Sequence, residues 1–241
     1  MNTYKNKLCA LSFLVFLISF VGAISFYINT NTAETIYDAK NAWDKNDYSR
    51  AFSIFKRLAD NGDMHAQNNL GEIYRHGTLV KQDYLEAEKW YKKSAEQGFA
   101  PAQFHLGVMY GGDHGLPIDY GRSEYFFRLS AEQGFPSAQA AIGLMYDDGI
   151  GVEQSHVKAS EWYRKAAENG IAMAQYRLGI MYVYGRGVPQ DPILAHMWFN
   201  IAAANGNDSA VKARDFLSSG LSPTQLIEAQ RLARDWYLSK H

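Results

Sequence analysis

The sequence predicts an all-α protein in which repeated helix pairs stack into a solenoid. Five glycines stand 36 residues apart, at Gly62, Gly98, Gly134, Gly170 and Gly206. Five alanines keep the same step, at Ala66, Ala102, Ala138, Ala174 and Ala210. Behind each of the first four alanines, apolar residues recur at steps of four, which is the spacing of one helical face. A fixed period of about 20–50 residues is typical of repeat arrays, which offer a long surface but carry no chemistry in the period itself.

The composition limits the class of protein and the kinds of partner. The 241 residues are 47% hydrophobic and 20% charged, which is ordinary for a folded chain and argues against long disorder. The formal net charge is −1 and no half of the chain is strongly basic, so no nucleic-acid partner is expected. The single cysteine, Cys9, excludes an intramolecular disulfide and a thiol-rich metal site.

Residues 1–29 have the features of a membrane-targeting segment. Lys5 and Lys7 precede a run of 21 residues without a charge, residues 8–28. About 20 apolar residues span a bilayer as a helix, and the positive flank favours a cytoplasmic N-terminus. A cleavable signal peptide is the alternative, because residues 21–23 resemble a small-residue cleavage site. Both interpretations place residues 30–241 across a membrane, anchored through residues 8–28 or secreted. In a bacterium this is the periplasmic side of the inner membrane, which we expect, and in a eukaryote it would be the lumen of the endoplasmic reticulum.

The first helix of each repeat is predicted from one pattern, Ala-Gln followed by Leu-Gly and Tyr. The fourth copy reads Ala174-Gln175, Leu178-Gly179 and Tyr182, and the earlier copies begin at Ala66, Ala102 and Ala138. A glycine inside a helix costs about 1 kcal/mol relative to alanine. Because it recurs in all four copies, we expect a neighbouring helix to approach too closely for a side chain.

A glycine-rich loop and a second helix follow each first helix. The third copy of the loop reads Gly149-Ile150-Gly151-Val152, with no preceding strand and no Gly-Lys-Ser/Thr, so it is interpreted as a turn rather than a phosphate loop. The second helix places Ala159 and Ala167 around Trp162-Tyr163. Small and large side chains at spacings of three and four allow neighbouring helices to interlock. The glycine of the 36-residue series, which we call the ladder glycine, then ends the helix.

Together these motifs, A-Q-x-x-L-G-x-x-Y, G-x-G-V and A-x-x-W-[YF]-x-x-A-A-x-x-G, resemble the Sel1-like repeat, a relative of the tetratricopeptide repeat. The resemblance implies a right-handed α/α superhelical solenoid. It divides the chain into a tetratricopeptide-like helix pair at residues 30–64, four Sel1-like repeats at 65–209 and C-terminal capping helices at 210–241. We call the four Sel1-like repeats units one to four. In the cap, Ser222-Pro223 gives a helix start.

The resemblance also implies a binding surface, because first helices line the concave face of tetratricopeptide-like arrays. The side chains at these positions vary between units: unit four is apolar and unit one is polar. We expect a partner protein or peptide with its apolar anchor on unit four and its polar end on Glu72 and Arg75. The predicted partner-binding residues are Met173, Tyr176, Ile180, Val183, Tyr184, Phe104, Val108, Leu144, Glu72 and Arg75. The alternative is that the C-terminal helices cover the unit-four residues.

No motif predicts catalysis, a cofactor or a metal site. Ser53 and Lys56 match S-x-x-K, but they lie in a repeat helix without the companion motifs of serine enzymes that act on penicillin. Asp147-Asp148 lack the further ligands of a calcium loop and are interpreted as a solvated helix end. The histidines are scattered and no H-E-x-x-H occurs.

The expected function is therefore a non-catalytic scaffold, adaptor or regulator in the cell envelope that binds another protein. Two alternatives stay open. One is an immunity or inhibitor protein against a secreted toxin in the periplasm, and the other is an enzyme that acts on the cell wall or on β-lactams.

Overall fold

The computed structural model describes residues 34–113 and 116–240. Within these residues all regular structure is helical, with twelve α-helices and one π-helical segment. The predicted all-α class is thus confirmed. The chain divides after Asn61 into two compact parts, the N-terminal unit and the C-terminal unit, and the C-terminal unit contains the four repeats called units one to four.

The N-terminal unit is a helix pair, α2 (Ile36–Asp44) and α3 (Tyr48–Asp60), which pack against each other. Thr35 begins α2 with a capping box, in which its hydroxyl and the Asp38 carboxylate each accept a backbone N–H. Asp47 caps α3 by accepting from the Arg50 N–H. Small buried residues at Ala39 and Ala51 allow the two helices to approach closely.

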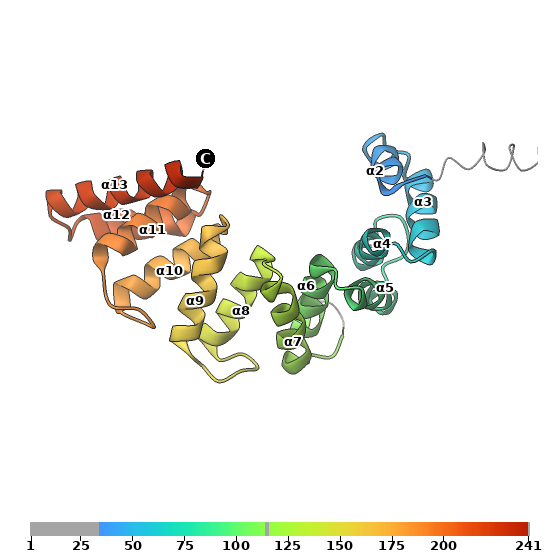
Figure 1. Cartoon of the computed structure of the whole chain (residues 1–241), viewed down its shortest axis with the longest axis horizontal. Helices are drawn as coiled ribbons and strands as arrows, with labels where there is room; N and C mark the ends of the chain where they lie inside the picture. The colour runs from blue at the N-terminus through green and yellow to red at the C-terminus, as the bar shows by residue number, and fades with distance from the viewer. Residues whose placement is uncertain (1–33, 114–115, 241) are drawn as a thin grey trace, which may run out of the picture. The chain divides into compact units, whose positions relative to one another are not determined.

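The C-terminal unit alternates first and second helices (Figure 1). The first helices are α4 (Met64–His76), α6 (Ala100–Val108), α8 (Pro136–Asp148) and α10 (Ala172–Tyr184). The second helices are α5 (Tyr84–Glu96), α7 (Tyr120–Glu132), α9 (His156–Glu168) and α11 (Pro192–Ala204). Each first helix packs against its own second helix, and α6, α8 and α10 also pack against the second helix of the preceding repeat.

Unit two departs from the others at the end of its first helix. Helix α6 continues as the π-helical segment η1 (Met109–Asp113), and Gly112 has a φ of 112°. In the other three units the left-handed residue comes one register position later, at the glycine that caps the first helix, such as Gly149 with a φ of 70°. The shift follows from the sequence, because unit two has Asp113 where the others have that glycine.

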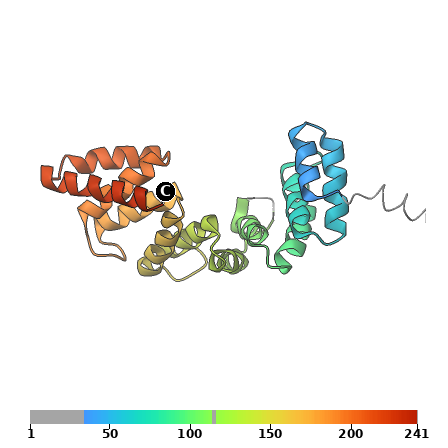
Figure 2. The same cartoon turned by 45° about the horizontal axis from the view of Figure 1, so that its top comes forward.

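Two helices follow the repeats, α12 (Asp208–Ser218) and α13 (Pro223–Lys240), and both pack against α11 (Figure 1; Figure 2). Helix α12 takes the place of another first helix. The Asn207 N–H donates to the Ala202 carbonyl at 3.0 Å, as the Ile171 N–H donates to the Ala166 carbonyl at 3.1 Å one repeat earlier. Helix α13 then turns back onto α11, and its Ala229 and Ala233 are buried.

Candidate functional site: the first-helix face

The ten predicted partner-binding residues lie on the first helices α4, α6, α8 and α10. Met173 and Tyr184 are exposed, and Tyr184 keeps 63% of its surface accessible. The other six apolar residues are partly buried and pack against the core of the stack; they are Phe104, Val108, Leu144, Tyr176, Ile180 and Val183. The predicted residues therefore combine an exposed layer with a supporting layer.

The structure brings Val108 and Leu144 together across two repeats. Both line a pocket of about 270 Å³ between units two and three, whose other lining residues are Gly111, Tyr120, Ser123, Phe127, Ala141, Met145 and Ile150. Gly111 stands at the position that Arg75 and Asp147 occupy in units one and three. The missing side chain helps to leave this space open, and no charged side chain lines it.

The C-terminal helices leave Met173 and Tyr184 of unit four exposed, and both α12 and α13 pack against α11. Tyr176 instead packs on Phe199 of its own repeat, with the ring centroids 5.8 Å apart. Tyr184 projects at the end of α10, where the Arg186 guanidinium lies 5.1 Å from its ring centroid. The open part of the apolar surface is thus the exposed layer, Met173 and Tyr184.

Sequence reasoning missed Phe216, the most exposed large hydrophobic residue in the described ranges, with 83% of its surface accessible. It lies on α12, one 36-residue step after Ile180, and so continues the row of first-helix positions. Helix α12 does not read as a first helix because Arg214-Asp215 replaces the Leu-Gly pair. The series of alanines 36 residues apart ends at the fully buried Ala210, and this signal could have identified α12 as a further first helix that carries Phe216.

In unit one the face is polar and its groups are already paired. The Glu72 carboxylate accepts from the Tyr91 hydroxyl at 2.5 Å and from the Arg75 guanidinium at 2.7 Å. His76 Nε2 lies 3.1 Å from Glu72 and His105 Nδ1 lies 3.2 Å from it. Burial would raise the pKa of Glu72, but the hydrogen bond from Arg75 and the charge of His105 outweigh it and lower the pKa. Glu72 therefore stays ionised and organises its neighbours.

Unit three has the same buried tyrosine without the glutamate. Leu144 stands where unit one has Glu72, so the buried Tyr163 hydroxyl lacks the carboxylate partner that Tyr91 has. Burial and the negative charge of Asp147 raise the pKa of Tyr163, so the hydroxyl stays protonated.

Asp147 lies one turn after Leu144 and pairs with His156 at 3.0 Å and Arg177 at 3.7 Å. Only 13% of its side chain is accessible. The prediction of a solvated helix end is therefore wrong for Asp147, because a histidine from the next helix and an arginine from the next repeat cover it.

The groups that resembled chemistry in the sequence have ordinary structural partners. The Ser53 hydroxyl donates to the Arg50 carbonyl at 2.9 Å, and Lys56 pairs with Asp60 at 3.1 Å. Both contacts are local to α3, as expected for a polar helix face. In the described part of the chain, no group of three or more His, Cys, Asp or Glu residues has the arrangement of a metal site.

These features define a class, the α-solenoid repeat proteins. The chain belongs to the Sel1 repeat family, whose model matches residues 44–63, 65–99, 100–135, 136–171 and 172–207. The resemblance drawn from the motifs is confirmed. The first match also falls within residues 30–64, the segment expected to be a shorter tetratricopeptide-like pair.

Solved structures show the same fold. A Sel1 repeat protein from Oxalobacter formigenes is 29% identical, with a TM-score of 0.72 over 83% of this chain and 85% of that chain. The protective antigen c5321 of uropathogenic Escherichia coli, which displays an SLR fold, is 28% identical with a TM-score of 0.57. Its match covers 83% of this chain but only 52% of c5321. A Sel1 repeat protein from Klebsiella pneumoniae is 23% identical, with a TM-score of 0.50 over 76% of this chain and 90% of that chain. No curated protein matches the sequence.

Family membership supports a general role. Sel1 repeat proteins are protein-interaction scaffolds, and their fold is generally non-catalytic. Across residues 34–113 and 116–240, no helix is both long enough and apolar enough to cross a bilayer. The predicted anchor or signal peptide at residues 1–29 lies outside the described residues, so it stays a prediction.

Proposed function

We propose that this protein is a non-catalytic scaffold or adaptor of the bacterial cell envelope that binds a partner protein through its first-helix face. The observation that carries the proposal is the apolar surface of α10 and α12, where Tyr184 and Phe216 keep 63% and 83% of their surfaces accessible. Contiguous exposed apolar residues on a folded protein mark interaction sites, and aromatic anchors supply much of the binding energy.

The surface is suited to an extended or helical segment with several apolar side chains. Tyr176 and Ile180 are half-buried on the same helix as Tyr184 and pack against the core, so ordering them on binding costs little. The pocket between Val108 and Leu144 offers a second apolar contact toward the N-terminal repeats. The ionised Glu72, with Arg75 beside it, is the polar end of the same row.

Alanine at the exposed rings tests the proposal. We expect the double variant Tyr184→Ala/Phe216→Ala to weaken partner binding at least about tenfold, because each aromatic anchor contributes roughly 1 kcal/mol or more. The measurement is quantitative affinity capture from envelope extract with the full chain as bait, followed by titration of the captured partner. Tyr176→Ala is a poorer test, since Tyr176 packs on Phe199 and its loss would also lower stability.

The matched control is Leu85→Ala/Leu238→Ala, which removes two equally exposed side chains from α5 and α13. Unchanged partner binding is expected there, and both double variants should unfold at the wild-type temperature. If the Tyr184→Ala/Phe216→Ala variant binds the partner as tightly as the control variant and the wild type do, the first-helix face is not the binding surface. A captured secreted toxin would favour the immunity alternative.

The envelope location is proposed from residues 1–29 alone, where Lys5 and Lys7 precede the apolar run. Cell fractionation with protease protection tests it. The repeats should be digested by protease added to spheroplasts, and protection until the inner membrane is lysed would contradict the location.

A further inference from the structure

The surface of α11 beneath α13 differs from the same surface of the other second helices. At the position of Asn200 the earlier units have Lys92, Arg128 and Arg164. At the position of Ala204 they have Glu96, Glu132 and Glu168. Helix α11 has therefore lost its charges on the side that α13 approaches. A side that served only for packing would favour apolar residues, yet Asn200 keeps a polar amide there.

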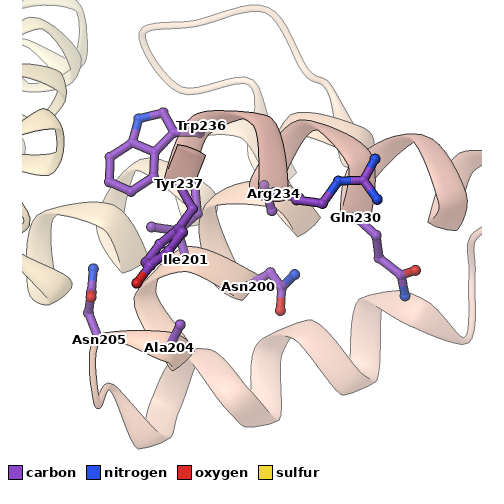
Figure 3. A pocket seen from close by; sticks show the side chains of 9 residues that line it. Asn200, Ile201, Ala204, Asn205, Gln230, Arg234, Trp236 and Tyr237 are labelled. Carbon is purple, nitrogen blue, oxygen red and sulfur yellow. The ribbon is translucent and has the colours of Figure 1, made fainter. Parts of the chain in front are cut away.

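A pocket of about 210 Å³ lies between the two helices. Trp236 and Tyr237 lie at one end of it, Gln230 and Arg234 lie at the other, and Asn200 lies between them (Figure 3). Ile201, Ala204 and Ala233 add apolar lining, and Asn205 completes it. Pockets for drug-sized ligands measure about 300–1,000 Å³, so this smaller pocket suits a ligand the size of a single amino-acid residue.

The polar groups of the pocket are mostly donors with spare capacity. The Asn200 Oδ1 accepts from Arg214 at 3.4 Å, which leaves its amide N–H groups to donate elsewhere. The Asn205 amide donates to Gln175 at 2.9 Å, which leaves the Asn205 Oδ1 as an acceptor. Gln230 is exposed and adds a second amide. These groups match a ligand that brings a negative charge and one N–H.

Arg234 is the one ionised side chain among the lining residues. Its Nε lies 3.8 Å from the Asp235 carboxylate, which is beyond hydrogen-bond length. Asp235 instead accepts from Arg231 at 2.8 Å. The Arg234 guanidinium is thus held only loosely by its own chain, and it can form a charge-assisted, two-pronged bond to a carboxylate.

We propose that this pocket binds the C-terminal residue of a partner polypeptide that ends in an apolar amino acid. The free α-carboxylate accepts from Arg234 and from the Asn200 and Gln230 amides. The side chain lies against Trp236, Tyr237 and Ile201, and the N–H of the terminal residue donates to the Asn205 Oδ1. A C-terminal residue carries all three features within the size of the pocket, whereas an internal acidic side chain lacks a separate apolar group.

This site is formed by α11 and α13, apart from the first-helix face, so its test is separate from that of the proposed function. Loss of peptide binding here leaves the role of Tyr184 and Phe216 intact, and the reverse also holds.

The experiment measures fluorescence anisotropy of the full chain with three labelled probes. The first is a Gly-Ser hexapeptide that ends in leucine with a free carboxylate. The second is the same peptide with a C-terminal amide, and the third is amidated and carries an internal glutamate. We expect the free acid to bind at least about tenfold more tightly than either amidated probe, because charge-assisted hydrogen bonds are the strong ones.

Arg234→Gln should reduce binding of the free acid to the level of its amide. The side chain is 70% accessible, so the variant is expected to fold as wild type does, which circular dichroism checks. Lys212→Gln, an exposed cation on α12 outside the pocket, is the matched control and should bind normally. Equal binding of acid and amide, no binding of the free acid, or equal binding by the glutamate probe would each overturn the proposal.

Discussion

At the scale of single residues, the glycine inside each first helix is explained by one ring of the paired second helix. A Cβ atom on Gly71 or Gly107 would lie 2.5 Å from a ring carbon of Tyr91 or Phe127. The same holds for Gly143 at 2.6 Å from Tyr163 and for Gly179 at 2.5 Å from Phe199. The close approach that the sequence predicted is therefore confirmed, and the side chain that makes it is the second of the two adjacent aromatic residues in the second helix.

Gly143→Ala tests this packing. The added methyl group must displace the fully buried Tyr163 ring, and overpacking costs about 1–3 kcal/mol against a helix-propensity gain of about 1 kcal/mol. We expect a net loss of about 1–2 kcal/mol, seen as a lower urea midpoint with an unchanged slope.

Gly121→Ala is the matched control, because Gly121 lies in the first turn of α7 and has room for a side chain. A Cβ atom added there would meet Asp119 Oδ1 at 3.5 Å, which is an ordinary contact distance. It should gain up to about 1 kcal/mol through helix propensity. If Gly143→Ala were as stable as Gly121→Ala, the packing account of the repeated glycine would fail.

The residues that sequence reasoning placed well are those whose partners lie at fixed steps in the repeat. Gly179 and Leu178 belong to this group, because every unit solves the same packing problem in the same way. The partners of Glu72 could not be predicted, because Tyr91 and His105 reach it from two other helices and vary between units. Phe216 was missed for a related reason: its helix lost the local motif although it kept its place in the stack.

At the scale of helices, a buried glutamine connects α6, α8 and α10 to the second helix on either side. Gln103, Gln139 and Gln175 each donate to a carbonyl in the last turn of the preceding second helix, at 3.3, 3.3 and 2.9 Å. Their side-chain oxygens accept from the amide residue before the ladder glycine, as Gln175 does from Asn205 at 2.9 Å. The last carbonyls of a helix have no intrahelical partner, so this glutamine serves as a C-cap supplied by the next repeat.

Gln175→Met should measure the strength of this connection. Methionine keeps the volume but removes the Gln175 hydrogen bonds to the Ala167 carbonyl, which still accepts from the Gly170 N–H, and to the Asn205 amide. A net hydrogen bond contributes about 0.5–1.5 kcal/mol, so the two together contribute about 1–3 kcal/mol. We expect an unfolding free energy lower by this amount in urea titrations. Gln190→Met removes an exposed bond to the Val183 carbonyl and should change stability by less than about 0.5 kcal/mol. Equal losses in the two variants would show that the buried amide is not the cause.

At the scale of the whole C-terminal unit, the stack ends because α12 cannot accept a second helix. Arg214 and Asp215 occupy the positions that Leu178 and Gly179 hold in unit four, so the close helix contact is lost. Helix α13 buries its apolar side against α11 instead, where Trp236 meets Trp198 edge to face with centroids 5.9 Å apart. The sequence predicts the amphipathic pattern of α13. It does not predict which helix α13 packs against, because that depends on the turn after α12, which lies outside the 36-residue repeat.

Trp236→Ala tests whether α13 closes the stack. A repeat array is stabilised by contacts between neighbours, so an end repeat that loses its cover loses stability and exposes apolar surface. Full burial of tryptophan would make its truncation cost 3–5 kcal/mol, and Trp236 is half-buried, so we expect about 2 kcal/mol. In thermal melts this corresponds to a decrease in Tm of about 4–8 °C.

Leu238→Ala lies two residues further along the same helix and removes a side chain that is 66% accessible. It should shift the Tm by less than about 2 °C, since exposed substitutions change stability by about 0.5 kcal/mol or less. If Trp236→Ala had the same Tm as Leu238→Ala, α13 would contribute little to the stability of the stack. A larger loss for Trp236→Ala, together with a gain in binding of a hydrophobic dye, would identify α13 as the cover of unit four. Unit four would then depend on α13 for stability while its first helix α10 keeps Met173 and Tyr184 open to a partner.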